Sequence, residues 1–137
     1  GYTKSKTEVS GFSKSSLKTE TIPSNPEQAE TISSLMANQK PYLNPDLDLP
    51  KLSELAGMNT KTISRIINHD LQMNFYEFVN KYRVEEFKQR LQQSDRDQLT
   101  LLGHAFECGF NSKSTFNHIF KKYTEQTPRE YYLKFKN

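Results

Sequence analysis

Two short segments of this chain carry side chains that can recognise DNA, at the spacing of one helix face. In each, hydrogen-bonding groups and cations lie opposite an apolar face. The first segment, about 60–68, carries Thr60, Lys61, Ser64, Arg65 and Asn68 on its polar face. The second, about 113–123, carries Lys113, Ser114, Asn117, His118, Lys121 and Lys122. Such groups donate hydrogen bonds to base edges and phosphate oxygens, so the pattern predicts nucleic-acid recognition.

The two segments belong to a pattern that occurs twice in the chain. Leu49, Leu52, Gly57 and Met58 correspond at a constant offset to Leu101, His104, Gly109 and Phe110. One additional residue, Asn111, then shifts the second copy. Beyond it, Asn59, Ile63, Ile66, Ile67, Asn74, Glu77 and Phe78 correspond to Ser112, Phe116, Ile119, Phe120, Thr127, Glu130 and Tyr131. The match predicts two copies of one supersecondary unit.

Each copy has the sequence features of a helix, a turn and a second helix. Gly57 provides a turn position for which we predict a positive φ, and Gly109 provides the corresponding turn. Asn59 and Ser112 are the predicted N-caps of the second helices. A helix, a glycine-containing turn and a helix with a polar face are typical of the helix-turn-helix, whose second helix enters the DNA major groove.

A long amphipathic helix is predicted between the two copies. Asn74 and Glu77 form a capping box at its start, and it runs to about Gln93. Its predicted apolar side consists of Phe75, Phe78, Val79, Tyr82, Phe87 and Leu91. About 20 residues span roughly 30 Å, close to the ~34 Å of one DNA turn. The helix therefore has the length to present two recognition helices to successive major-groove segments.

The sequence predicts an all-α fold of two helix-turn-helix subdomains, a linker helix and an extra N-terminal helix. We expect a flexible tail over 1–24 and a helix within 25–40 that begins at Asn25 and Pro26 and has Ile32, Leu35 and Met36 as its apolar stripe. The first subdomain is expected over 41–73, the linker helix over 74–94 and the second subdomain over 95–137. Within the last, the supporting helix is expected from Leu99.

The charge distribution adds weak support for a polyanionic partner. The net charge of the 137 residues is +3, but the segment from Asn111 to the end has six Lys and Arg against two Asp and Glu, a local charge of +4. A second capping box at Thr127 and Glu130 starts a last helix through Phe135, and its free N–H groups could hold a phosphate.

The second copy contains the run from Ala105 to Asn117, followed by Phe120-Lys121-Lys122 and by Thr127-Pro128. Together these motifs resemble the signature of AraC-type transcription regulators. The first copy, with Asn74-Phe75 and Tyr82-Arg83-Val84, is similar to that family's first helix-turn-helix and linker helix. The resemblance covers about Pro41 to Leu133 and implies a sequence-specific domain for double-stranded DNA, without catalytic chemistry.

The resemblance also implies roles for individual residues. Bases would be read by Lys61, Ser64, Arg65, Lys113, Ser114, Asn117 and His118. From the chemistry and position of the side chains, we further expect phosphates to be held by Thr60, Asn68, Lys121, Lys122, Thr127 and Arg129. Similar domains often end longer sensor proteins, including membrane-anchored ones. We therefore expect a cytoplasmic fragment of a longer protein, with no membrane contact of its own; homodimerisation through the N-terminal helix or through parts outside this sequence is compatible with this.

The sequence departs from the family pattern at three places that matter for the fold. His104 stands at an apolar core position, as a buried neutral side chain or as a pH-responsive one. Gln72 and Glu125 stand where the family often has Gly, so either the turn avoids positive φ or it is mildly strained.

Other kinds of site have little support in the sequence. His104 and Cys108 are four residues apart, as two metal ligands would be, but the sequence has no second Cys and no matching His pair to complete a tetrahedral set. Cys108 matches Ala56 and is interpreted as a small core residue. We expect no metal, no cofactor and no enzymatic activity. The alternative function is a helical interaction or dimerisation module that docks through the Tyr and Phe side chains of the linker and last helices.

Overall fold

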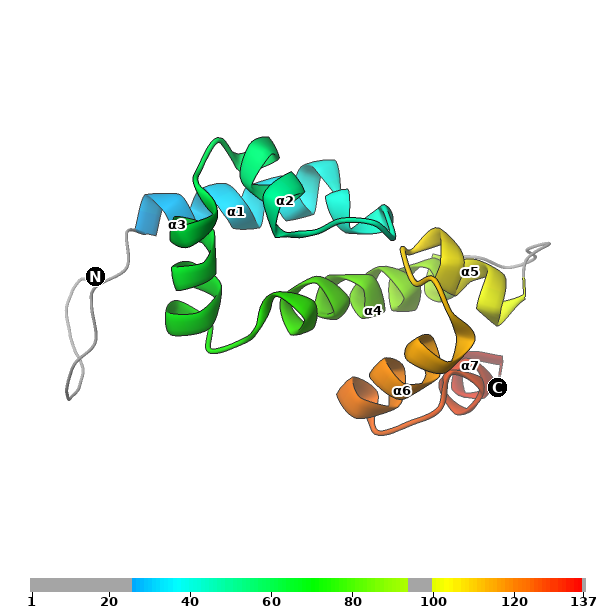
Figure 1. The fold of residues 1–137 in the computed structure, drawn as a ribbon. Helices are drawn as coiled ribbons and strands as arrows, with labels where there is room; N and C mark the ends of the chain where they lie inside the picture. Colours follow the sequence, from blue (N-terminus) through cyan, green and yellow to red (C-terminus); the bar gives the residue numbers. More distant parts are fainter. Residues whose placement is uncertain (1–25, 94–99, 137) are drawn as a thin grey trace.

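The computed structural model describes residues 26–93 and 100–136, and its regular elements there are helices (Figure 1). They are α1 (Pro26–Gln39), the 3-10 turn η2 (Pro41–Leu43), α2 (Leu49–Ala56), α3 (Thr60–Arg65), the π-helical turn η3 (Ile66–Asp70), α4 (Phe75–Gln93), α5 (Leu101–Glu107), α6 (Lys113–Thr124) and α7 (Pro128–Lys136). The predicted tail 1–24, the cap Asn25 and the helix start at Leu99 lie outside the described residues.

The linker helix α4 runs through the middle of the molecule, with the two copies packed on it (Figure 1). α1, α2 and α3 surround a first hydrophobic cluster, to which α4 contributes Phe78 and Val79. α5, α6 and α7 surround a second cluster, to which α4 contributes Val84, Phe87 and Leu91. The predicted all-α fold of two helix-turn-helix units and a linker helix is therefore confirmed.

The duplication predicts the buried positions of both copies. Ile63, Ile66 and Ile67 in the first copy and Phe116, Ile119 and Phe120 in the second are all buried. Phe116 and Phe120 pack edge-on against Phe87 of the linker helix, with ring centroids 4.9 and 5.3 Å apart. Equivalent side chains thus anchor the second helix of each copy against α4.

The predicted caps are also present in both copies. The side chain of Asn59 accepts from the N–H of Thr62 at 2.8 Å, and that of Ser112 accepts from the N–H of Thr115 at 3.1 Å. Gly57 has the predicted positive φ of 69°, and Gly109 has a φ of 109°. The chain reverses direction at the same point of each unit, because the turn chemistry is the same.

The two positions where the family often has Gly adopt the mildly strained backbone that was one of the two expectations. Gln72 and Glu125 both have positive φ, 57° and 62°. A non-glycine residue in this conformation costs about 1 kcal/mol, because its Cβ approaches the following carbonyl oxygen. The turn after each recognition helix is therefore kept despite the residue type.

The two recognition helices end differently. The first continues from α3 into η3, where the N–H of Leu71 donates to the carbonyl of Ile66, five residues back, at 3.0 Å. The second stays α-helical to its end, where the N–H of Glu125 donates to Lys121, four residues back. The predicted helix over 60–68 is thus an α-helix followed by a wider turn.

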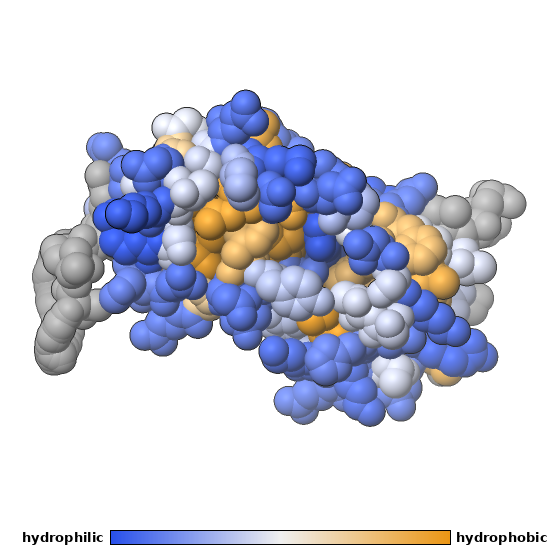
Figure 2. All heavy atoms as spheres, in the orientation of Figure 1, coloured by the Kyte–Doolittle hydropathy of each residue, from blue (hydrophilic) through white to orange (hydrophobic). Residues whose placement is uncertain are grey.

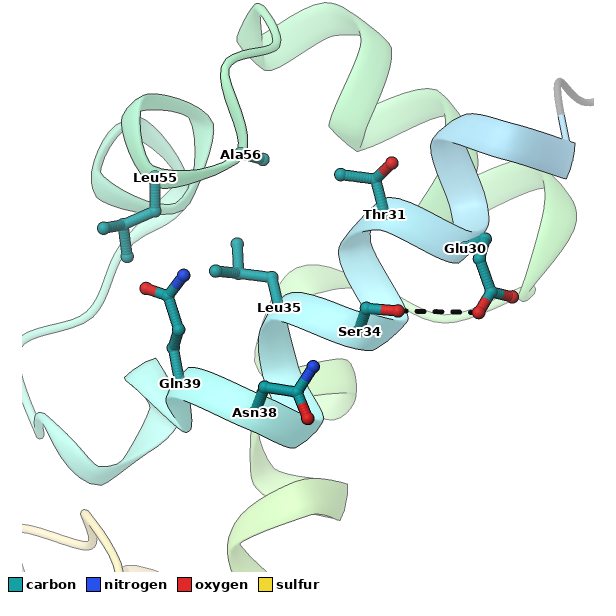
Figure 3. A pocket seen from close by; sticks show the side chains of 8 residues that line it. All are labelled: Glu30, Thr31, Ser34, Leu35, Asn38, Gln39, Leu55 and Ala56. Carbon is teal, nitrogen blue, oxygen red and sulfur yellow. Dashed lines mark hydrogen bonds between the residues drawn. The ribbon is translucent and has the colours of Figure 1, made fainter.

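α1 covers the first hydrophobic cluster. Its predicted stripe of Ile32, Leu35 and Met36 is buried there, and Tyr42 of η2 extends the same cluster. Between α1 and α2 an open groove remains, lined by side chains of both helices (Figure 3). The extra N-terminal helix is therefore part of the folded unit.

Candidate nucleic-acid interface

The second recognition helix, α6, presents all of its predicted reading side chains to solvent. Lys113, Ser114, Asn117 and His118 are exposed, whereas Phe116, Ile119 and Phe120 of the same helix are buried. The surface over α6 is accordingly hydrophilic in Figure 2. This separation leaves a polar face with amide, hydroxyl, imidazole and ammonium groups, which are the groups that contact base edges and phosphates.

The first recognition helix is less open than predicted. Thr60, Lys61 and Asn68 are exposed, but Ser64 and Arg65 are half-buried. The amide nitrogen of Asn68 donates to the hydroxyl of Ser64 at 3.0 Å. Two of the predicted reading side chains of the first copy thus have protein neighbours.

Arg65 lies against the N-terminal helix. Its Nη2 donates to Oε1 of Gln28 in α1 at 3.4 Å. His118, its counterpart in the duplication, is exposed on α6. The two positions that correspond in the duplication therefore differ in exposure, because α1 packs beside Arg65 in the first copy.

The two predicted phosphate-binding lysines of α6 differ in their surroundings. Lys121 is exposed, whereas Nζ of Lys122 lies 3.5 Å from Oε2 of Glu77 at the start of α4. The N–H of Asn74 and the Lys122 ammonium together hold the pKa of the Glu77 carboxyl below its usual value. The hydroxyl of Tyr123 also donates to the Glu77 carbonyl at 3.2 Å. These contacts join the end of α6 to the start of α4.

The start of α7 is already partly occupied by its own capping box. The N–H of Thr127 donates to Oε1 of Glu130 at 2.9 Å, and the N–H of Glu130 donates to the Thr127 hydroxyl at 3.1 Å. A phosphate held at Thr127 would therefore have to share or displace these bonds. Arg129 beside them is exposed.

Three polar residues of the linker helix are buried, which the predicted apolar side did not include. They are Asn80, Arg83 and Glu86. Arg83 is four residues from both Val79 and Phe87, so helical spacing places it on the buried stripe. This spacing is the sequence feature from which the burial of Arg83 could have been predicted. Polar residues remain in the interior there because Arg83 and Glu86 bond to the chain just before α2, and Arg83 also lies against Gly109 of the second copy.

Arg83 is hydrogen-bonded to the segment that precedes α2. Its Nε donates to the Tyr42 carbonyl at 2.7 Å, its Nη2 to the Asn44 carbonyl at 3.0 Å, and its Nη1 to Oδ1 of Asn80 at 3.2 Å. Burial lowers the pKa of the guanidinium from its usual value. The Tyr42 carbonyl also lies against Gly109, where a Cβ would stand 2.1 Å from the carbonyl oxygen.

Glu86 lies next to this group and accepts from three donors. They are Nζ of Lys40 at 3.2 Å, the hydroxyl of Tyr42 at 3.3 Å and Nε of Arg90 at 3.1 Å. Burial alone would raise the pKa of Glu86, but the hydrogen bonds from Lys40 and Arg90 bring it below its usual value. Arg90 also donates to Oε1 of Glu107 in α5 at 2.8 Å.

Within the described residues, the features that suggested chemistry are parts of the core. Cys108 is fully buried, and burial raises the pKa of its thiol to about 12. His104 is 6% exposed and occupies the core position of its counterpart Leu52. No group of three or more His, Cys, Asp and Glu that could hold a metal ion is found in residues 26–93 and 100–136. Nor does any helix in these ranges have the length and apolar character to cross a membrane.

Most aromatic side chains proposed for a docking surface are used inside the fold. Phe78 and Phe87 of α4 are buried, and Tyr131 and Tyr132 of α7 pack against the second cluster. The exposed large apolar side chains belong to several elements: Leu55, Leu71, Tyr76, Phe106, Tyr123 and Leu133. Their distribution gives little support to the alternative of an interaction module.

Comparison with known sequences identifies relatives of this fold. A family model described as a helix-turn-helix domain matches residues 52–133. An uncharacterised HTH-type transcriptional regulator of Staphylococcus aureus (strain COL) is 33% identical over 90 residues, which are 66% of this chain and 12% of that protein. The HTH-type transcriptional activator RhaS of Pectobacterium carotovorum is 32% identical over 78 residues, or 57% of this chain and 27% of the activator. The matching region is thus a small part of both relatives.

Solved structures share the arrangement of helices. The C-terminal domain of AraT, a response regulator from Geobacillus stearothermophilus, gives a TM-score of 0.64 at 23% identity, covering 80% of this chain and 86% of that one. The C-terminal domain of the two-component response regulator yesN from Fusobacterium nucleatum gives 0.63 at 24% identity, covering 77% and 98%. At these identities the likeness concerns the fold.

Proposed function

Because this chain belongs to the AraC-type family of helix-turn-helix DNA-binding transcription regulators, we propose that its helices α3 and α6 read two successive major-groove segments of double-stranded DNA. The observation that carries the proposal is the exposed polar face of α6 opposite three buried apolar side chains. α4, with 19 residues, is about 28 Å long at 1.5 Å per residue, close to the ~34 Å of one DNA turn.

The base-reading roles follow from the chemistry of the side chains. On α6, the amide of Asn117 suits adenine, which offers one donor and one acceptor, and His118 lies beside it. Lys113 and Ser114 lie in the first turn, which in a recognition helix lies closest to the base edges. On α3, Arg65 suits the two acceptors of guanine, and Lys61 and Ser64 complete the reading set.

Phosphate contacts would position the domain without reading sequence. We assign them to Lys121 and Lys122 at the end of α6, Thr127 and Arg129 at the start of α7, and Thr60 and Asn68 on the first recognition helix. Lys122 and Thr127 would exchange their contacts with Glu77 and Glu130 for phosphate contacts.

A selection experiment tests the function. The chain is incubated with a pool of randomised duplex DNA, and the bound fraction is amplified and measured by gel shift over a range of salt concentrations. We expect one enriched sequence with two separated elements and an affinity that falls linearly with the logarithm of salt concentration. Without an enriched sequence and without salt-sensitive binding, the DNA-reading role is wrong.

The two lysines at the end of α6 allow a test of the phosphate contacts. We expect Lys121→Ala and Lys122→Ala each to weaken all DNA sequences alike and to reduce the salt slope by about 0.9. The loss should be smaller for Lys122, because the wild-type side chain must first give up its solvent-screened pair with Glu77. Lys81→Ala, an exposed lysine of α4 outside the assigned set, is the matched control. An altered base preference in either variant would contradict this role.

We further infer that the chain is the DNA-binding part of a longer cytoplasmic regulator and is not itself an enzyme. The Staphylococcus aureus relative supports the greater length, since its matching region is 12% of that protein. Dimerisation through α1 is a prediction that sedimentation tests. If the domain stays monomeric as its concentration rises, any dimer contact must lie in other parts of the protein.

A further inference from the structure

Seven residues join the two copies to the middle of the linker helix, and we call them the junction. They are Lys40, Tyr42, Arg83, Glu86, Arg90, Glu107 and Gly109. They come from the segment before α2, from α4, and from α5 and the turn after it. The junction is therefore the place where the first copy, the linker helix and the second copy meet.

Tyr42 is the central residue of the junction. Its hydroxyl donates to Glu86, its ring stacks on Tyr82 with centroids 5.6 Å apart, and its carbonyl accepts from Arg83. The same carbonyl lies against Gly109 of the second copy. The segment before α2 is thus held to α4 and to the second copy at once.

Glu86 extends the contacts along the linker helix. It accepts from Lys40 and Tyr42 of the segment before α2 and from Arg90, which in turn donates to Glu107 of α5. Glu86 and Arg83 are each less than a tenth exposed, so water competes little for these bonds. The contacts leave little freedom for one copy to rotate about α4 relative to the other.

We propose that the junction sets the separation and rotation of the two recognition helices, and so the spacing between the two DNA elements that the domain accepts. Arg83 and Glu86 are then positioning residues that contact no DNA. This inference rests on the proposed function, because it requires that α3 and α6 both bind. One inserted base pair moves the second element by about 3.4 Å and rotates it by about 35°, which a rigid frame does not follow.

The experiment measures affinity against spacing. The probes are the duplex selected by the wild-type chain, the same duplex with one base pair inserted or deleted between its elements, and duplexes with a single element. The variants are Glu86→Gln and Tyr42→Phe, which keep the shape of the side chains. Glu85→Gln is the control. It removes the same charge from α4 as Glu86→Gln does, but Glu85 pairs with Lys88, which lies outside the junction.

For the wild-type chain and Glu85→Gln we expect a loss of about tenfold or more with one inserted or deleted base pair, because two linked contacts add only when geometry lets both form. For Glu86→Gln and Tyr42→Phe we expect this loss to shrink to about threefold or less, with unchanged affinity for single elements. Circular dichroism checks that the variants are folded.

The possible failures have different meanings. If the wild-type chain binds without any dependence on spacing, reading by two helices is wrong and this inference falls with it. If the wild-type chain depends on spacing and both variants keep the full dependence, the inference alone is overturned. It is also overturned if the variants lose affinity for single elements as much as for the paired site, since a positioning role predicts a change in spacing dependence only.

Discussion

Gly109→Ala is expected to lower the free energy of unfolding by about 3 kcal/mol, whereas Gly57→Ala should lower it by only about 1 kcal/mol. The two glycines occupy the same place in the duplicated unit and both have positive φ, so both substitutions strain the backbone. Only Gly109 has neighbours in the way. An added Cβ would lie 2.1 Å from the Tyr42 carbonyl oxygen and 2.6 Å from Nε of Arg83, while at Gly57 nothing lies within 4 Å.

Urea denaturation followed by circular dichroism measures the difference. The Gly57→Ala chain serves as the matched control, because it reports the backbone strain without the steric conflict. The expected excess for Gly109 comes from forcing apart the carbonyl of Tyr42 and the guanidinium of Arg83, which breaks a buried charged hydrogen bond. Equal losses for both variants would show that the approach of the second copy to Tyr42 contributes nothing to stability.

Arg65→Ala is expected to reduce affinity for the selected DNA by about 1 to 3 kcal/mol and to remove the preference at one base pair. The reason is that a bidentate contact from the guanidinium to guanine would be lost, whereas the phosphate contacts would remain. A gel-shift series with all four base pairs at each position of the first element measures the effect. A uniform loss on every sequence would instead assign Arg65 to the phosphates.

The contact between Arg65 and α1 provides a second variant for the same measurement. The hydrogen bond from Nη2 to Gln28 is 3.4 Å long and joins two half-buried side chains, so Arg65 gives up little when it turns to DNA. Gln28→Ala should therefore keep the base preference, with affinity equal to that of the wild-type chain or higher. If Gln28→Ala loses the preference as Arg65→Ala does, Gln28 helps to aim the guanidinium.

Local sequence patterns predicted most of the fold. The duplication identified the buried positions around Ile63 and Phe116, and the caps at Asn59 and Ser112 formed because their side chains bond N–H groups three residues away. The exposed face of α6 followed from the same periodicity. All of these features depend on neighbours within one or two helical turns, which a sequence pattern records directly.

The features that were missed depend on partners far along the chain. Arg83 was not among the predicted buried residues, because its acceptors are main-chain carbonyls about 40 positions earlier, and such acceptors leave no trace in side-chain type. Arg65 was expected on an open face, but Gln28 of α1, which is 37 residues earlier in the sequence, lies beside it. The π-helical turn at Ile66–Asp70 was also missed, since both α- and π-helical turns suit the same residues there.

The main-chain acceptors of Arg83 have a consequence for how such a domain can change over generations. Mutation can replace the side chain of Asn44, but it cannot remove the carbonyl group that accepts from Arg83, so this contact of the junction tolerates drift at position 44. The reading side chains lie on the opposite, solvent-facing side of α6 from its core contacts. New DNA preferences can therefore arise by exchange of surface residues, while the buried residues of the junction stay the same.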